Sequence, residues 1–286
     1  MRTTGKRERG HPLRALTMAV VLALLAALLL AGVALAVAKP GKPTAKTPKG
    51  AITSASPTFK WSKAARGARY EVRVYKGSKL QLKKTGITKL SWKSSTALPE
   101  EVSLTWKVRA GNAGGNGAWS KSPTFEVVSI GTSYQGGIVA YILQSGDPGY
   151  VAGETHGLIA ATADQSTGIR WYSGAYVVTG ATGKALGTGS ANTTAIIAVQ
   201  GGSPITYAAG LARAYSGGGL TDWYLPSKDE LNALRINRVA LGGLSGCYWC
   251  SSENDYNSAW NQCMFDGSLF INVKDDTYRV RAVRAF

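Results

Sequence analysis

Histidine and cysteine are scarce in this sequence, with two and three residues among 286. His11 lies in a basic N-terminal segment, which leaves His156 for the rest of the chain. A lone histidine directly before a predicted strand is more typical of a structural role than of catalysis, which needs a partner group. The sequence also lacks a Gly-Xaa-Ser-Xaa-Gly motif, a Walker loop and zinc-ligand spacing. We therefore expect no enzymatic activity, no catalytic residue and no organic cofactor.

Acidic residues are few, with 16 against 33 lysines and arginines, which gives a formal net charge of +17. Residues 53–128 carry 14 basic and 4 acidic residues, whereas residues 129–286 carry 10 and 11. Attraction of polyanions is therefore expected in the middle of the chain. The 35 glycines do not recur at every third residue, which excludes a collagen helix, and an apolar fraction of 44% argues against general disorder.

Residues 1–38 have the pattern of an export segment. Basic residues up to Arg14 precede an uncharged run of 24 residues, Ala15 to Ala38, which is long enough to span a membrane. The run ends in small-residue cleavage sequences, so it is either a signal peptide or a signal anchor that remains in the membrane as one helix. In both cases we expect the rest of the chain outside the cell or on its surface, where nucleic acid is not an expected partner.

The next two regions differ in pattern. Residues 39–52 contain three prolines and four lysines without apolar periodicity, which predicts a stiff, charged linker. Residues 53–128 show short alternations of apolar and polar residues between glycine turns, which predicts an all-β sandwich. Trp61, the run Tyr70–Val74 and the sequence Gly117-Ala-Trp-Ser120 make this region resemble a fibronectin type III module.

Basic side chains are expected on the outward positions of this sandwich, where they would attract polyanions in a salt-dependent way. The alternative is a solvated basic face on a spacer module. The predicted polyanion-binding residues are Lys60, Arg69, Arg73, Lys107 and Arg109.

Residues 129–286 mix strand and helix patterns, which predicts an α+β domain. The clearest local signal is Ser227 followed by Glu230, a capping box that should start a helix after Pro226. We expect two further helices, at 190–199 and 204–215. Strands are expected at 138–142, 157–161, 248–252, 259–265, 270–273 and 278–286.

Several motifs of this region occur in an order that resembles a known family. They are Gly136–Tyr141, His156–Ala161, Gly187–Asn192, Asp222–Leu231, Tyr248–Ser252 and Val280–Arg284. The family is that of the Lcl C-terminal domain, the globular head of bacterial collagen-like adhesins. The resemblance implies a C-type-lectin-like fold, a surface location and, as in those adhesins, homotrimers that bind sulfated glycosaminoglycans.

Four residues of this domain are the predicted ligand-binding residues. Tyr256 and Asn257 lie in the loop of a predicted hairpin, and Arg279 and Arg281 share one face of the last predicted strand. The alternative for the arginines is that they are charges on an edge strand that prevent aggregation.

Three cysteines in an exported chain suggest one disulfide and one free thiol. Cys250 and Cys263 pair if they occupy adjacent strands of the hairpin, and Cys247 with Cys263 is the competing pairing.

Calcium is the one metal that remains open, because carboxylates are frequent around the capping box and hard cations prefer oxygen ligands. No EF-hand loop is present, and helix capping explains Asp229 and Glu230. The other carboxylates of this group are Asp222, Glu253, Asp255 and Asp266.

Together these patterns predict an exported bacterial surface protein, an adhesin or binding protein that recognises a glycan, such as a sulfated polysaccharide, or another extracellular ligand. The alternative is a structural or assembly module of the cell envelope that binds no sugar.

Overall fold

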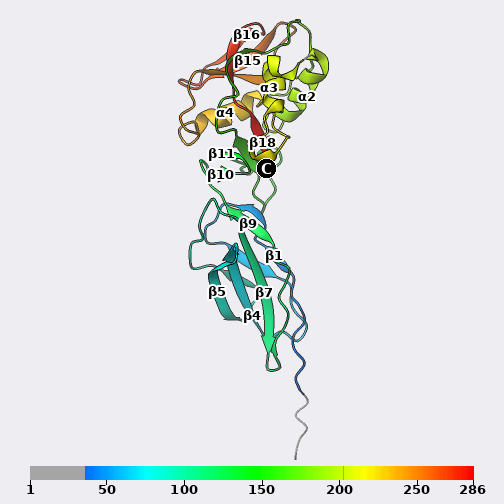
Figure 1. The fold of residues 1–286 in the computed structure, drawn as a ribbon, viewed down its shortest axis with the longest axis vertical. Helices are drawn as coiled ribbons and strands as arrows, with labels where there is room; N and C mark the ends of the chain where they lie inside the picture. The colour runs from blue at the N-terminus through cyan, green and yellow to red at the C-terminus, as the bar shows by residue number, and fades with distance from the viewer. Residues whose placement is uncertain (1–35, 202) are drawn as a thin grey trace, which may run out of the picture.

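The computed structural model describes residues 36–201 and 203–286. Two units lie end to end (Figure 1): an N-terminal sandwich, and a C-terminal unit of residues 129–286 that we call the head. The predicted export segment, residues 1–38, lies almost wholly outside the described residues. In the part of the chain that is described, no helix is both long enough and apolar enough to cross a membrane.

The sandwich consists of two sheets, with strand orders β1-β3-β6 and β2-β9-β7-β4-β5, and β8 paired to β7. Alternate residues of the two central strands, such as Val72 and Val108, are fully buried between the sheets. This confirms the predicted β-sandwich. The strands are β1 (Ala45–Thr47), β2 (Gly50–Ile52), β3 (Thr58–Trp61), β4 (Arg69–Lys76), β5 (Lys79–Ile87), β6 (Ser91–Lys93), β7 (Leu104–Asn112), β8 (Gly115–Asn116) and β9 (Thr124–Val127).

The prediction of a free linker at residues 39–52 is wrong. Strand β1 pairs with β3, and β2 runs parallel to β9, so this segment belongs to the sandwich. Pro40, Pro43 and Pro48 are buried, while the lysines between them are exposed. The indole Nε1 of the fully buried Trp106 donates a hydrogen bond of 2.8 Å to the carbonyl oxygen of Pro48. The sequence has the composition of a solvated linker because the residues that pack this segment onto the sandwich are prolines. Proline is also typical of linkers, so its burial here cannot be recognised from composition.

The head contains two sheets and three α-helices among the described residues. The four-stranded sheet has the order β10-β11-β12-β18, and the five-stranded sheet has the order β13-β17-β14-β15-β16. The strands are β10 (Ser133–Tyr134), β11 (Gly137–Ile142), β12 (Gly157–Ala160), β13 (Ser166–Arg170), β14 (Cys247–Glu253), β15 (Ser258–Cys263), β16 (Leu269–Val273), β17 (Thr277–Val280) and β18 (Val283–Ala285).

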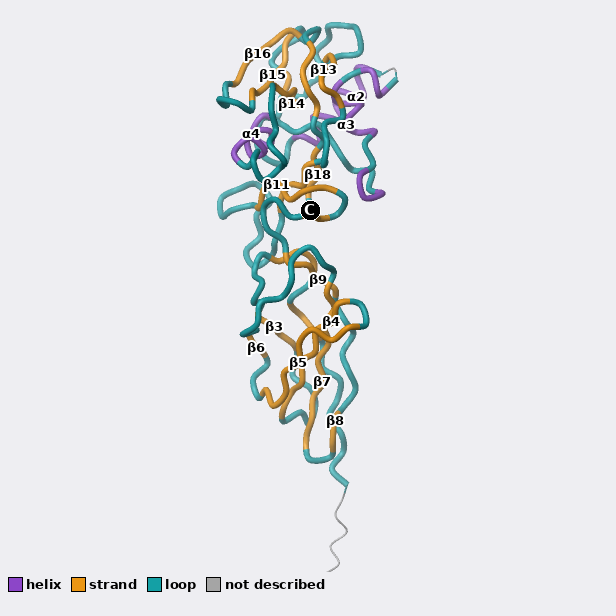
Figure 2. Tube along the Cα trace, turned by 60° about the vertical axis from the view of Figure 1, so that its left-hand side comes forward, coloured by secondary structure: helices purple, strands orange, loops and turns teal. Residues whose placement is uncertain are grey.

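The helices cover two sides of the head (Figure 2). Helices α2 (Gly189–Gln200) and α3 (Ala208–Ala214) pack on a core that includes Trp171, Trp223 and Trp249, all fully buried. Helix α4 (Lys228–Ile236) lies on the other side, over a second core that contains Leu234 and Met264. The head is therefore an α+β unit with an apolar core of its own.

The predicted capping box is confirmed at the start of α4. The Ser227 hydroxyl accepts from the backbone N–H of Glu230 at 3.4 Å, and the Glu230 carboxylate accepts from the backbone N–H of Ser227 at 2.8 Å. Glu230 is fully buried and also accepts from the N–H of Gly187. Burial raises the pKa of Glu230 above its usual value, against the effect of these hydrogen bonds. The box thus fixes the loop before α2 as well as α4.

Two predicted elements are interrupted. The predicted helix at 204–215 is a short 3-10 turn, Pro204–Thr206, followed by α3, because Tyr207 between them has an extended backbone. The predicted last strand at 278–286 is divided between the two sheets of the head as β17 and β18. Ala282, which lies between them, donates its N–H to the side chain of Gln165.

Candidate functional site

The clearest cluster of cationic and aromatic side chains lies on the outer face of the larger sandwich sheet. Strands β4 and β7 are antiparallel, and their register places Arg73 opposite Lys107 and Glu71 opposite Arg109. Because the neighbouring residues of both strands point into the core, these four side chains point outward. We call Arg73, Tyr75, Lys107, Arg109 and Trp119 the Trp119 face.

Trp119 lies at the centre of this face. Its ring centroid is 4.5 Å from Cζ of Arg109 and 5.0 Å from both Cζ of Arg73 and Nζ of Lys107. Nζ of Lys107 is also 4.8 Å from the ring centroid of Tyr75. These distances are typical of cation–π contacts, which hold cationic side chains in place without neutralising them.

Glu71 anchors the two arginines of the face. Its carboxylate accepts from Nε of Arg73 at 2.7 Å and from Nη2 of Arg109 at 2.6 Å. Burial alone would raise the pKa of Glu71, but the hydrogen bonds from Arg109 and Arg73 outweigh it and hold the pKa below its usual value. One carboxylate therefore orients two guanidinium groups, while Lys107 forms no ion pair with any described residue.

The structure brings together most of the predicted polyanion-binding residues. Arg73, Lys107 and Arg109 are adjacent, and Arg69 begins strand β4 on the same outward side. Lys60 lies on β3 of the other sheet, so it faces away from this cluster. The aromatic members of the face, Tyr75 and Trp119, were not among the residues predicted from the sequence to bind a ligand. The available signal was the position of Tyr75, two residues after the outward-facing Arg73.

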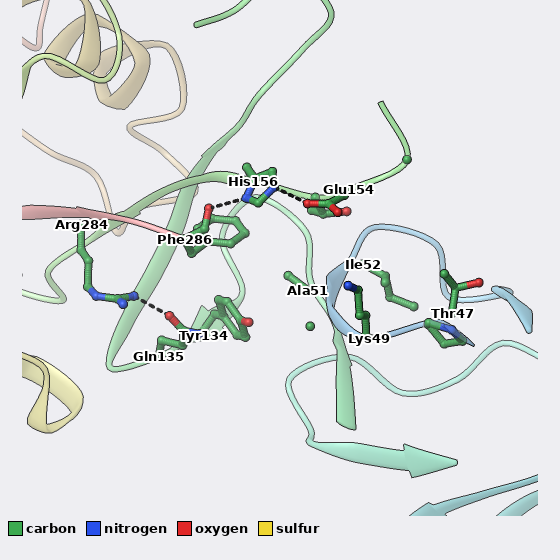
Figure 3. Close-up of a pocket in the computed structure, with 14 residues that line it drawn as sticks. Thr47, Lys49, Ala51, Ile52, Tyr134, Gln135, Glu154, His156, Arg284 and Phe286 are labelled. Carbon is green, nitrogen blue, oxygen red and sulfur yellow. Dashed lines mark hydrogen bonds and ion pairs between the residues drawn. The ribbon is translucent and has the colours of Figure 1, made fainter. Parts of the chain in front are cut away.

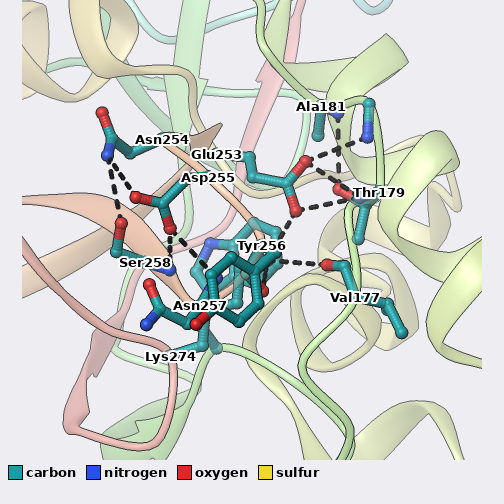
Figure 4. A network of polar contacts seen from close by, with 12 residues as sticks. Val177, Thr179, Ala181, Glu253, Asn254, Asp255, Tyr256, Asn257, Ser258 and Lys274 are labelled. Atoms are coloured by element: carbon teal, nitrogen blue, oxygen red, sulfur yellow. Dashed lines mark hydrogen bonds and ion pairs between the residues drawn. The ribbon is translucent and has the colours of Figure 1, made fainter.

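A buried ion pair between Lys274 and Glu253 contacts the backbone of the predicted ligand loop, which contains Tyr256 and Asn257 (Figure 4). Nζ of Lys274 lies 2.6 Å from the Glu253 carboxylate, and the two side chains are 0% and 1% exposed. Lys274 also donates to the carbonyl oxygens of Tyr256 and Val177 at 2.9 Å. Glu253 accepts from the backbone N–H of Thr179 at 2.9 Å. All three protons of the ammonium group thus have acceptors, and one of these bonds fixes the loop.

The two loop residues themselves differ in their surroundings. Tyr256 is 57% exposed, and the N–H of Asn257 donates to the carboxylate of Asp255 at 3.0 Å. An exposed aromatic ring on a fixed backbone suits stacking against a ligand.

The two predicted arginines of the head are used internally. Nη1 of Arg279 and Nε of Arg281 donate to Asp164 at 2.9 and 2.7 Å, and the hydroxyl of Tyr248 donates to the same carboxylate. Arg281 is buried, and β17 lies between β13 and β14. The expectation that these arginines lie on an edge strand is therefore wrong. Their partner is 115 residues away in sequence, so no local pattern indicates it.

The disulfide joins Cys247 to Cys263, which is the second of the two pairings considered from the sequence. Cys247 and Cys263 are opposite each other in the register of β14 and β15 and form the disulfide. The prediction of a bond between Cys250 and Cys263 is wrong, because Cys250 is three residues along β14 and points to the other face of the sheet, into the core beneath α4. Burial raises the pKa of its thiol to about 12, so it is an inert core residue.

The carboxylates considered as calcium ligands have different partners in different parts of the head. Asp222 pairs with Arg284, Glu253 with Lys274, and Asp266 accepts from Ser268 within a turn. Within residues 36–201 and 203–286, no three His, Cys, Asp or Glu side chains are grouped so that they could hold a metal ion.

A cavity of about 430 Å³ lies where the two units meet (Figure 3). The segment Thr47–Ile52 lines one side, and Tyr134 and Phe286 line the other. His156 has its ring nitrogens 3.0 Å from the Glu154 carboxylate and 3.2 Å from the carbonyl oxygen of Phe286. None of the predicted binding residues lines this cavity, and His156 is committed to contacts within the chain.

No family model matches the sequence, and no curated protein does. Among solved structures, the FN5 domain of Drosophila Lar matches at 18% identity with a TM-score of 0.26, over 31% of this chain and 96% of that one. A Fn3-like protein from Clostridium thermocellum matches at 19% identity with a TM-score of 0.24, over 33% of this chain and 97% of that one.

A fimbrial protein from Bacteroides ovatus matches a longer stretch, 86% of this chain and 70% of its own, at 13% identity with a TM-score of 0.42. The matches to the FN5 domain and to the Fn3-like protein each cover about a third of this chain.

Proposed function

We propose that this protein is an exported surface protein that binds an anionic extracellular glycan through the Trp119 face. The single observation that carries the proposal is the placement of three cationic side chains around Trp119, on a unit with 14 basic and 4 acidic residues. Export rests on the sequence pattern of residues 1–38.

The chemistry of the face suits sulfate or carboxylate groups. Arg73 uses only Nε towards Glu71, so its Nη groups can donate to a ligand oxygen as well as to the nearby Tyr75 hydroxyl. Lys107 adds an ammonium group that lies between the rings of Tyr75 and Trp119. Because Glu71 and Trp119 hold these cations in place before binding, little side-chain entropy is lost when the ligand docks.

A test must separate this site from the general positive charge of the sandwich, which would retain any polyanion. The double variant Lys83→Gln/Lys107→Gln removes one charge from the face and one directly beside it, since Lys83 lies opposite Arg73 in the β4–β5 register. The matched control, Lys60→Gln/Lys93→Gln, removes two charges from the outward side of β3 and β6 in the other sheet.

Binding of residues 36–286 to heparin oligosaccharides is measured at physiological salt by calorimetry. The face variant should weaken binding by about tenfold, as expected for the loss of charged hydrogen bonds, and Trp119→Ala by a similar factor. The control should bind within about twofold of the wild type, because exposed charges at a distance contribute little. Equal loss in both double variants contradicts a defined site.

The head carries a second binding proposal, which is the lectin-like role of the Lcl C-terminal domain family. It is supported by the α+β composition of the head and by the pairing of its early strand β12 with its last strand β18. In this proposal Tyr256 and Asn257 contact a glycan. Tyr256→Ala should abolish binding to any neutral glycan that the wild type recognises, with and without calcium.

A further inference from the structure

Strand β16 forms one edge of the five-stranded sheet, at the end of the head that lies away from the sandwich (Figure 1). Its apolar side chains are largely open to solvent: Leu269 is 39% exposed, Phe270 48%, Ile271 47% and Val273 44%. Phe265, in the turn that precedes the strand, is 88% exposed. No residue of the strand carries a charge.

Two other edge strands among the described residues, β5 and β13, are protected against pairing. Edge strand β5 of the sandwich carries Lys79, Lys83 and Lys84, and its register with β4 shifts twice. Edge strand β13, on the opposite side of the same sheet as β16, carries Arg170 and a register shift. Strand β16 has a continuous register of five pairs with β15 and none of these devices. Proteins avoid such edges unless another strand covers them.

The backbone of β16 is also available. The N–H of Cys263 donates to the carbonyl of Ser268, and the N–H of Lys274 donates to the carbonyl of Asn257. Because backbone direction alternates along a strand, the even-numbered residues face β15 and the odd-numbered residues face outward. The N–H groups of Leu269, Ile271 and Val273 therefore point away from the sheet.

We infer that β16 pairs with β16 of a second copy of this chain, antiparallel and centred on Ile271. This register places Ile271 opposite Ile271, and Leu269 of each copy opposite Val273 of the other. The outward-facing residues of one strand then meet those of the other, as a hydrogen-bonded antiparallel ladder requires. Two uncharged strands of equal length cover each other's apolar side chains, and the head is close to neutral, with 10 basic and 11 acidic residues.

The flanking charges distinguish this association from glycan binding. Asp266 and Asp276 lie in the turns just beyond the two ends of β16, so the same register brings Asp266 of one copy towards Asp276 of the other at both ends of the ladder. Like charges in this position repel, and salt screens them. Self-association should therefore strengthen as salt is raised, whereas binding of a polyanion to the Trp119 face weakens.

The test is analytical ultracentrifugation of residues 36–286, a range that contains the apolar core of the sandwich and both apolar cores of the head. The wild type should show a monomer–dimer equilibrium. Ile271→Lys places a charge on the edge, and Ile271→Pro removes an N–H that β15 does not use, so that the sheet itself stays intact. Each variant should raise the dimer Kd by about a hundredfold. The matched control is Leu80→Lys, at an apolar residue of edge strand β5 that is 44% exposed.

Hydrogen exchange of the wild type supplies a readout that needs no variant. The amides of Leu269 and Ile271 should exchange more slowly as protein concentration rises. A wild type that stays monomeric at every soluble concentration overturns the inference, as does a trimer or a dimer that survives both Ile271 variants. A dimer unaffected by glycan, or glycan binding by a monomeric Ile271→Lys variant, separates this inference from the function proposed for the sandwich.

Discussion

In the sandwich, Glu71 is buried beneath its two partners, but the Arg73 and Arg109 side chains are 29% and 22% exposed. In the head, Glu253 and Lys274 are 1% and 0% exposed, and Arg281 is buried against Asp164. The Glu71 carboxylate orients cations that remain partly exposed to a ligand. In the buried Glu253–Lys274 pair, all three ammonium protons have acceptors inside the fold. The same residue types thus serve recognition in one unit and structure in the other.

The largest effect should come from breaking the buried pair. Lys274→Met leaves the Glu253 carboxylate buried without its cation, which should cost about 3–5 kcal/mol of unfolding free energy. Denaturant unfolding of residues 36–286, followed by hydrogen exchange, should show lost protection in the head and unchanged protection in the sandwich.

The control for this variant is Glu253→Gln combined with Lys274→Met, which removes both charges. Part of the stability should return, because no unpaired charge remains buried. If the unfolding free energy of Lys274→Met lies within about 1 kcal/mol of the wild-type value, the structural role of the pair is contradicted.

Removal of the disulfide should have the next largest effect. Replacing both Cys247 and Cys263 by serine opens a loop with a sequence separation of 16 residues, which should cost about 3 kcal/mol. Cys250 tests the pairing independently. Its thiol should resist alkylation in the native protein, because burial raises its pKa to about 12, and it should react only on unfolding. Rapid labelling of Cys250 in the folded state would contradict this assignment.

The smallest effect should come from the ion pairs that Glu71 forms with Arg73 and Arg109 in the sandwich. The folded-state pKa of Glu71 lies below its ordinary value of 4.5, so its contribution is fully present above that pH and is lost as the pH falls through the folded pKa. Glu71→Gln should reduce stability at neutral pH by about 1 kcal/mol and should abolish this part of the acid dependence.

Glu126→Gln on β9 of the same sheet is the control with the opposite sign. Burial and the nearby Glu101 raise the pKa of Glu126, so its carboxylate destabilises the fold as the pH rises above 4.5. If both variants change the acid dependence in the same direction, the assignment of Glu71 as the anchor of the arginines is wrong.

Features set by neighbouring residues could be predicted from the sequence. The capping box at Ser227 and Glu230 involves residues three apart, and alternation along β4 and β7 indicates which side chains face outward. The disulfide could not be resolved, because it depends on the register between β14 and β15, which local patterns leave open. The ion pair of Arg281 could not be predicted either, because its partner Asp164 is 117 residues away in the sequence.

The candidate site shows the same division. Outward cations on adjacent strands could be predicted as a set, but Lys60 was included because alternation gives an outward direction without saying which sheet the strand joins. Trp119 was missed because a tryptophan in a sandwich is most simply a core residue. Its position over the cations depends on the course of the chain after β8.

The parallel pairing of β2 with β9 also determines how the sandwich carries mechanical load. Strand β2 is reached from the N-terminal side of the described chain, whereas β9 leads to the head. A pull between that side and the head draws the two strands in opposite directions along their length, so the hydrogen bonds between them are sheared together and not opened one by one. Under tension, the three residues of β2 and the bond from Trp106 to Pro48 act as a clamp that must break before the sandwich extends.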